Sequence, residues 1–147
     1  MPIKTFRGLI LNGTQDTIVL HTNDGSTGYR IVKFQVMAPD SSEHIESAVK
    51  IYKVFQTTIN DTIDFSDNTL LAAAIIDQSA TGQNYPSDQT VIFDTEVFNQ
   101  DIYITTSGGD YSANINYYVE LEQVKLDLSE STVATLKDIR NVKTQGF

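Results

Sequence analysis

Short runs of strand-forming residues, separated by turn residues, follow one another along most of this chain, and this pattern limits the folds open to it. The runs are rich in β-branched and aromatic residues, and turn signals recur about every 8–12 residues. A strand that is apolar on one face needs a second layer to cover it. We therefore predict an all-β fold, an antiparallel β-sandwich of about eight strands, with a jelly roll as the leading topology.

The first two predicted strands, residues 3–11 and 17–22, are separated by Asn12-Gly13. Asn-Gly is a strong signal for a two-residue hairpin, because both central positions of a type I′ turn need a positive φ. The sequence therefore predicts that these two strands pair with each other.

Alternation of apolar and polar residues predicts two half-buried strands, residues 29–37 and 47–57. The residues expected on their inner faces are Val32, Phe34, Val36, Val49, Ile51 and Phe55. Lys53 interrupts the second row, and we expect it to snorkel to solvent or to mark the edge of the strand. Residues 70–76 are apolar throughout, which favours a strand covered on both faces.

The last third of the chain predicts a closing hairpin. Residues 97–106 and 112–128 are strand-like and flank the turn-forming residues 107–110. In the second run the apolar residues change parity near Gln123. Because one inserted residue flips every later side chain to the other face, this change predicts a bulge or bend at that point.

Beyond this run, residues 130–142 are predicted to form a short amphipathic helix. Its apolar stripe is formed by Val133, Leu136, Ile139 and Val142. The stripe either covers the protein's own sandwich or docks on a neighbouring subunit, and we take it as the candidate interface. The predicted organisation is a sandwich domain over residues 1–128, with the helix and tail over residues 129–147 in the same domain or as a docking arm.

Composition excludes several classes of partner and site. The formal net charge is −9 and the Lys and Arg residues are scattered, so we expect no direct contact with nucleic acid. The absence of Cys excludes disulfides, thiolate metal sites and cysteine catalysis. No apolar run approaches the roughly 20 residues of a membrane helix, and we expect no membrane partner.

An oxygen-rich segment, residues 60–68, contains Asp61, Asp64 and Asp67 together with two Asn side chains. Carboxylate and amide oxygens suit a hard cation such as calcium, so the three Asp residues are calcium candidates. The segment lacks the central Gly and the closing Glu of an EF-hand loop. The plainer interpretation is a solvated loop with Asx turns, which these residues favour without a metal.

Catalytic signals are weak. Glu120 and Glu122 share a strand face, and such a pair could act as acid and base in glycoside cleavage, although two solvated acids are the commoner case. His21 and His44 show no metal-ligand spacing, and we expect structural or surface roles. The tyrosines that could stack on sugars, if they gather on one face, are Tyr29, Tyr85, Tyr111 and Tyr117. We predict no catalytic residue and no cofactor.

Four phrases of the sequence carry a resemblance to a protein family. They are residues 65–71 (FSDNTLL), 98–103 (FNQDIY), 116–122 (NYYVELE) and 134–140 (ATLKDIR). In these phrases the chain resembles small virion structural proteins of marine tailed bacteriophages. The resemblance implies a β-sandwich located in the virion that decorates or cements the capsid. It also implies the major capsid protein or another virion protein as partner, and a homo-oligomer, with a trimer as one candidate state.

The leading hypothesis is therefore a non-enzymatic virion protein that acts through protein–protein contacts. The alternative is a carbohydrate-binding or host-recognition β module that uses Tyr and Asn, Asp or Gln side chains in its loops, Tyr85 among them. A hydrolase built on Glu120 and Glu122 is a third and more distant hypothesis.

Overall fold

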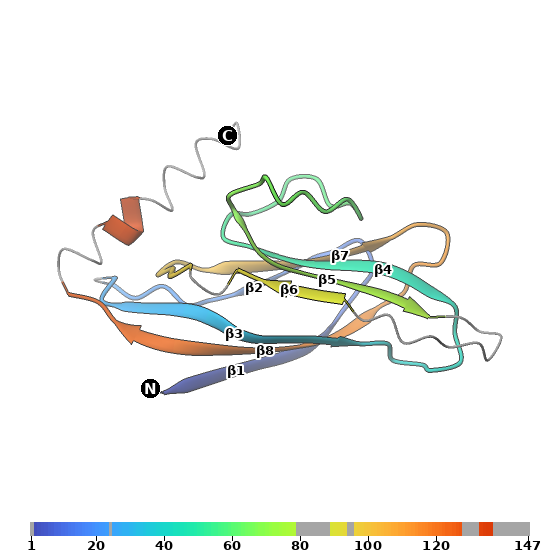
Figure 1. Ribbon diagram of the computed structural model, residues 1–147, viewed down its shortest axis with the longest axis horizontal. Helices are drawn as coiled ribbons and strands as arrows, with labels where there is room; N and C mark the ends of the chain where they lie inside the picture. The colour runs from blue at the N-terminus through green and yellow to red at the C-terminus, as the bar shows by residue number, and fades with distance from the viewer. Residues whose placement is uncertain (1, 24, 79–88, 94–95, 128–132, 137–147) are drawn as a thin grey trace.

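The computed structural model describes residues 2–23, 25–78, 89–93, 96–127 and 133–136, which form eight β-strands in two facing sheets and one short helical turn (Figure 1). The strands are β1 (Ile3–Ile10), β2 (Gln15–Ile18), β3 (Thr27–Met37), β4 (Ile45–Tyr52), β5 (Leu70–Gln78), β6 (Gln89–Ile92), β7 (Ile102–Gly108) and β8 (Ile115–Lys125). The helical turn comprises residues 133–136. The predicted all-β sandwich with a short C-terminal helix is confirmed. The predicted boundary between residues 128 and 129 lies outside the described residues.

The smaller sheet has the order β1-β8-β3 and the larger one β2-β7-β4-β5-β6, with every neighbouring pair antiparallel. A jelly roll wound from one folded ribbon of eight strands would pair the first strand with the eighth, the second with the seventh, the third with the sixth and the fourth with the fifth. Three of these pairs are present, but β6 is hydrogen-bonded to β5 and not to β3. The sandwich is therefore confirmed and the jelly roll is not.

The predicted hairpin at Asn12-Gly13 is wrong, because β1 and β2 lie in different sheets. A turn does form there: the Thr14 amide donates to the Leu11 carbonyl over 3.2 Å. Gly13 has a φ of 75°, whereas Asn12 is not in the left-handed region. Positive φ at the second central residue alone is the pattern of a type II turn, which splays strands instead of pairing them. The turn thus sends the chain from one sheet to the other.

The predicted closing hairpin is also wrong. β7 pairs with β2 and β4 in the larger sheet, whereas β8 pairs with β1 and β3 in the smaller one. The chain between β7 and β8 crosses from sheet to sheet. Two long-range bonds hold this crossing: the Glu46 amide donates to the Tyr111 carbonyl over 2.9 Å, and the Asn12 amide donates to Asn114 Oδ1 over 2.9 Å.

No bulge lies at Gln123, because β8 pairs with β1 without a register shift and keeps its register with β3 at that residue. The change of parity has a simpler cause. Leu126 is buried, but it follows the last residue of β8 and is no longer bound by the period of the strand. Val124, the other apolar residue of the second parity that the structure describes, is only half-buried.

The irregularity lies in the partner strand. The register between β3 and β8 shifts between Ile31 and Lys33, so that Val32 is an extra residue on β3. Because such a bulge adds one residue to the strand, residues three positions apart across it face the same way. Ile31 and Phe34 are both buried, while Val32 is 38% exposed. The prediction that Val32 faces inward is therefore wrong, and those for Phe34 and Val36 are confirmed.

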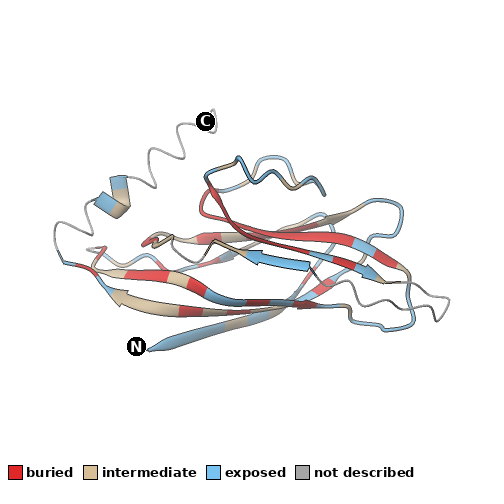
Figure 2. Cartoon of the chain, in the orientation of Figure 1, coloured by how far each residue is buried: buried red, intermediate tan, exposed pale blue. Residues whose placement is uncertain are grey.

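The core fills the space between the two sheets, where buried segments of facing strands meet (Figure 2). Its largest fully buried side chains are Phe98, Ile10, Ile31, Ile45, Ile51, Leu71, Ile102, Ile104, Ile115, Leu121 and Val49. Val49 and Ile51 lie on the inner face as predicted, and the predicted strand over residues 70–76 is present as β5. The described part of the chain contains no helix with the length and hydropathy of a membrane span.

A third layer covers part of the outer face of the larger sheet. Residues 53–69 contain no strand and run over β4 and β5 (Figure 1). A second, smaller apolar cluster lies beneath this segment. It consists of Tyr52, Leu70 and Ala73, with Ile63 and Phe93 packed against them. Side chains on the outer face of β4 are therefore buried as well.

This layer corrects two predictions at the end of β4. Lys53 neither snorkels nor marks an exposed edge, because its side chain is 2% exposed and its Nζ lies 3.4 Å from Glu96 Oε2. Phe55 is not on the inner face: β4 ends at Tyr52, and Phe55 lies beyond it, 54% exposed. Its ring meets the edge of the Tyr103 ring at a centroid distance of 5.7 Å.

Candidate functional site

The helical turn at residues 133–136 presents the described half of the predicted interface stripe to solvent. Val133 is 65% exposed and Leu136 is 56% exposed. The turn is tied to the sandwich through its other side, where Asn99 Nδ2 donates to Thr135 Oγ1 over 2.8 Å. Asn99 is fully buried and also donates to the Gly25 carbonyl over 3.1 Å. The other two stripe residues, Ile139 and Val142, lie outside the described residues.

Two of the three calcium candidates, Asp64 and Asp67, are used for local structure. Asp64 Oδ1 accepts bonds from the amide and hydroxyl of Ser66 at 2.9 and 2.6 Å, and Asp67 Oδ1 accepts the same pair from Thr69 at 2.9 and 2.6 Å. The bonds from Ser66 lower the pKa of Asp64. These are the Asx turns of the plainer interpretation. Among the described residues, the three Asp side chains do not form a group that could hold a metal ion.

An ammonium group occupies the position that a bound cation would take in this segment. Lys50 is 3% exposed, and its Nζ donates to Asn60 Oδ1 over 3.1 Å and to the Thr62 carbonyl over 2.6 Å. Burial lowers the pKa of Lys50, and the negative charges of Asp61 and Asp67 oppose that shift. The oxygen-rich loop therefore caps a lysine of the protein's own sheet.

The two glutamates proposed as an acid–base pair each have a partner on the outer face of the smaller sheet. The Tyr118 hydroxyl donates to Glu120 Oε1 over 2.8 Å, and this bond raises the pKa of Tyr118. Arg30 Nη2 donates to Glu122 Oε2 over 2.8 Å. The pair thus lies on the outer face of that sheet, with each carboxylate bonded to a neighbouring side chain. Neither glutamate lines the hollow of about 880 Å³ along the same sheet.

A large hollow, of about 880 Å³, lies along the smaller sheet and includes one further residue from β6. Its lining combines aromatic, amide and cationic side chains with apolar ones. The lining residues are Arg7, Gly8, Leu9, Phe34, Gln35, Val36, Met37, Thr90, Asn116, Tyr117 and Tyr118. Of the predicted stacking tyrosines, it contains Tyr117. Tyr85 lies outside the described residues.

The two histidines have different surroundings. His21 Nδ1 lies 2.7 Å from Asp101 Oδ1, which also accepts the amides of Leu20 and His21. His44 lies beside Glu46 and Asp77, and these three are the group of described residues whose ligand atoms could hold a metal ion. Sequence reasoning missed this group because Asp77 comes from another strand and joins the other two only through the register of β4 and β5.

No protein-family model matches this sequence, and no curated protein or solved structure shows significant similarity to it.

Proposed function

We propose that this protein is a non-enzymatic structural component of a phage virion, which decorates or cements the capsid through protein–protein contacts. The resemblance in four phrases of the sequence suggests the virion and names the major capsid protein or another virion protein as partner. It also suggests a homo-oligomer, with a trimer as one candidate state. The sandwich supports a binding role, because it is a rigid scaffold with an added segment at one end.

One observation carries this proposal: an anchored helical turn that directs Val133 and Leu136 away from the sandwich. A helix that served only to cover its own domain would bury its apolar stripe. Exposed apolar residues on a fixed helical turn are typical of helix-in-groove contacts with a partner.

A particle-binding experiment tests the proposal. The double variant Val133→Ser and Leu136→Ser removes the exposed apolar side chains, and we expect it to co-sediment with particles lacking this protein at least about tenfold more weakly than the wild type, as for loss of an interface anchor. Val19→Ser is the matched control, because Val19 is also 65% exposed but lies on the sandwich. Co-sedimentation of the double variant at the wild-type level would refute the docking role. Absence of the protein from purified particles by mass spectrometry would refute the virion role.

The large hollow supports the alternative, a carbohydrate-binding or host-recognition module. Tyr117 and Tyr118 supply aromatic rings, while Gln35 and Asn116 supply amide groups that can bond sugar hydroxyls. On a glycan array, binding that is lost in Tyr117→Ala or Asn116→Ala would support this function. Phe65→Ala serves as the control, because Phe65 is an exposed aromatic residue outside the hollow. No signal from the wild type across the array would count against it.

A further inference from the structure

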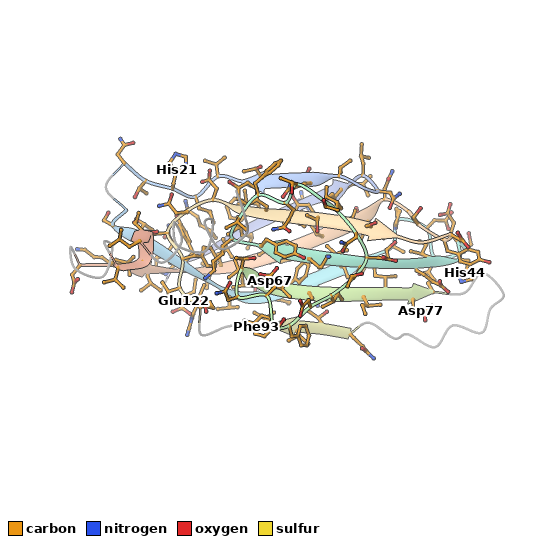
Figure 3. All side chains as sticks on the ribbon, turned by 90° about the horizontal axis from the view of Figure 1, so that it is seen from above. His21, His44, Asp67, Asp77, Phe93 and Glu122 are labelled. Atoms are coloured by element: carbon orange, nitrogen blue, oxygen red, sulfur yellow. The ribbon has the colours of Figure 1, made fainter. Side chains whose placement is uncertain are left out.

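One end of the larger sheet brings a histidine and two carboxylates together. His44 immediately precedes β4, Glu46 is the second residue of β4, and Asp77 lies one residue before the end of β5. The register pairs Glu46 directly with Asp77. Figure 3 shows His44 and Asp77 at the same end of the molecule, far from His21. Three side chains of metal-ligating type therefore meet at adjacent strand ends.

Their ligand atoms have the spacing of a coordination shell. The imidazole nitrogen and the two carboxylate oxygens all lie within 4.8 Å of one another. His44 Nε2 and Glu46 Oε1 are 3.2 Å apart. Two ligands of a tetrahedral ion with bonds of roughly 2.0–2.1 Å are separated by about 3.3 Å. The nitrogen and this oxygen can thus bind one ion without moving apart or together.

The surrounding charge favours a cation. Like charges directly opposite each other on neighbouring strands destabilise a sheet, and Glu46 and Asp77 form such a pair. Asp61 adds a third carboxylate to the lining of the adjoining hollow of about 410 Å³, and that lining contains no Lys or Arg. Elsewhere in the described structure Arg30 neutralises Glu122, and Lys53 lies beside Glu96. Glu46 is paired only with the titratable His44 among the described ion pairs.

The histidine is held in place from two sides. The Tyr111 ring stacks on the His44 ring with centroids 3.7 Å apart and an interplanar angle of 20°. The segment before His44 is fixed by Gln78 Nε2, which donates to the carbonyls of Asp40 and Glu43 over 2.8 Å each. Groups that orient a ligand reduce the cost of ordering it when the ion binds.

We propose that His44, Glu46 and Asp77 form a binding site for one divalent transition-metal ion of the zinc class. Zinc accepts imidazole nitrogen together with carboxylate oxygen, whereas calcium and magnesium prefer shells made of oxygen alone. Three protein ligands leave a fourth position open to water. The ion would join the end of β5 to the start of β4 and to the segment that precedes it.

Zinc titration of the full chain, first stripped of metal with a chelator, tests this site by calorimetry. We expect one Zn²⁺ per chain, with binding at least about tenfold weaker in His44→Ala and in Asp77→Asn, as for loss of one ligand. The matched control is His21→Ala, because His21 and Asp101 form a similar exposed histidine–carboxylate pair that belongs to no described metal-ligating group. Its affinity should equal that of the wild type. The absorption spectrum of bound Co²⁺ should change in the same two variants, because it responds to the loss of a ligand.

The inference would be overturned by wild-type affinity in both His44→Ala and Asp77→Asn, by an equal loss in His21→Ala, or by Ca²⁺ binding as tight as Zn²⁺ binding. Absence of stoichiometric Zn²⁺ binding by the wild type would overturn it as well. Asp77→Asn preserves the shape of the side chain, so it keeps the test valid if His44→Ala fails to fold.

Discussion

Replacing Gly108 with alanine should destabilise the sandwich, because β7 ends there against the backbone of its neighbours. Gly108 pairs with Ser47 at the end of the ladder between β7 and β4. An added Cβ would overlap the Glu46 carbonyl oxygen and would lie 2.8 Å from Ser47 Oγ and 3.0 Å from the Ser112 Cα. Two of these three atoms belong to the backbone and cannot rotate away. Accommodating the methyl group therefore requires β4 and the crossing segment to separate.

The cost can be assembled from two contributions. Overpacking a rigid site typically costs about 1–3 kcal/mol. Separation of the segments also weakens the bond from the Glu46 amide to the Tyr111 carbonyl, which adds about 1 kcal/mol. We expect a loss of about 2–4 kcal/mol in the free energy of unfolding. For a domain of this size, that corresponds to a fall in Tm of roughly 5–12 °C. Thermal unfolding followed by circular dichroism and urea unfolding should both detect it.

The adjacent glycine provides the control. The nearest atom to a Cβ on Gly109 would be Asp61 Oδ2, 4.0 Å away, and Gly109 does not have a positive φ. Gly109→Ala should therefore leave Tm within about 3 °C of the wild type, since it only reduces the entropy of the unfolded chain. Equal Tm values for Gly108→Ala and the wild type would refute the steric argument. An equal fall in both variants would show that the segment tolerates no side chain at all.

The outer layer and the helical turn are each held by contacts that single substitutions remove. Burial raises the pKa of Tyr52 to about 12, so its contribution to stability is complete below pH 10 and is lost as the pH rises toward 12. A pKa unit is worth about 1.4 kcal/mol, and solvent partly screens the hydroxyl. As the pH rises toward 12, the free energy of unfolding measured with urea should therefore fall by about 1–2 kcal/mol less in Tyr52→Phe than in the wild type. Equal falls in both proteins would contradict this. Lys50→Met removes the donor to residues 60–62, and hydrogen exchange of that segment should accelerate by roughly fivefold or more; unchanged exchange would show that the lysine does not hold the loop. Thr135→Val removes an acceptor of Asn99 and should accelerate exchange at residues 133–136 by about fivefold, whereas Thr135→Ser should restore the wild-type rate.

Local alternation was enough to predict the strands and much of the core. Val49 and Ile51 face inward because a strand repeats every two residues, and that rule needs no knowledge of the partner strand. Pairing is not local in this sense. The φ values at Asn12-Gly13 differ from those of a hairpin turn, and the residues between β7 and β8 cross between sheets. A turn motif predicts a change of direction, but it does not determine which strand is met next.

The candidate metal site depends on strand pairing, which is not a local property of the sequence. Asp77 reaches Glu46 only through the register of β4 and β5, so no spacing in the sequence points to their meeting. Alternation places Lys50 on the side of its strand opposite Val49 and Ile51, but it does not reveal whether another segment covers that side. Residues 53–69 cover that face, so the lysine is buried among loop oxygens. The period of residues 130–142 predicted an apolar stripe but left open whether the stripe covers the sandwich or docks on a neighbour. Its two described residues, Val133 and Leu136, are exposed on the helical turn.

The central position of β8 in the smaller sheet has a consequence for the order of folding. Both β1 and β3 pair with β8 and not with each other, and the ladder joins Ile3 to Glu122. Contacts between such distant residues close a long loop before they return any stabilisation, which slows folding. During synthesis β1 and β3 therefore have no partner strand in this sheet until β8 has been made, which requires the chain to reach residue 125. We expect the smaller sheet to form late and in one step, so that removing β8 would abolish the sheet instead of shortening it.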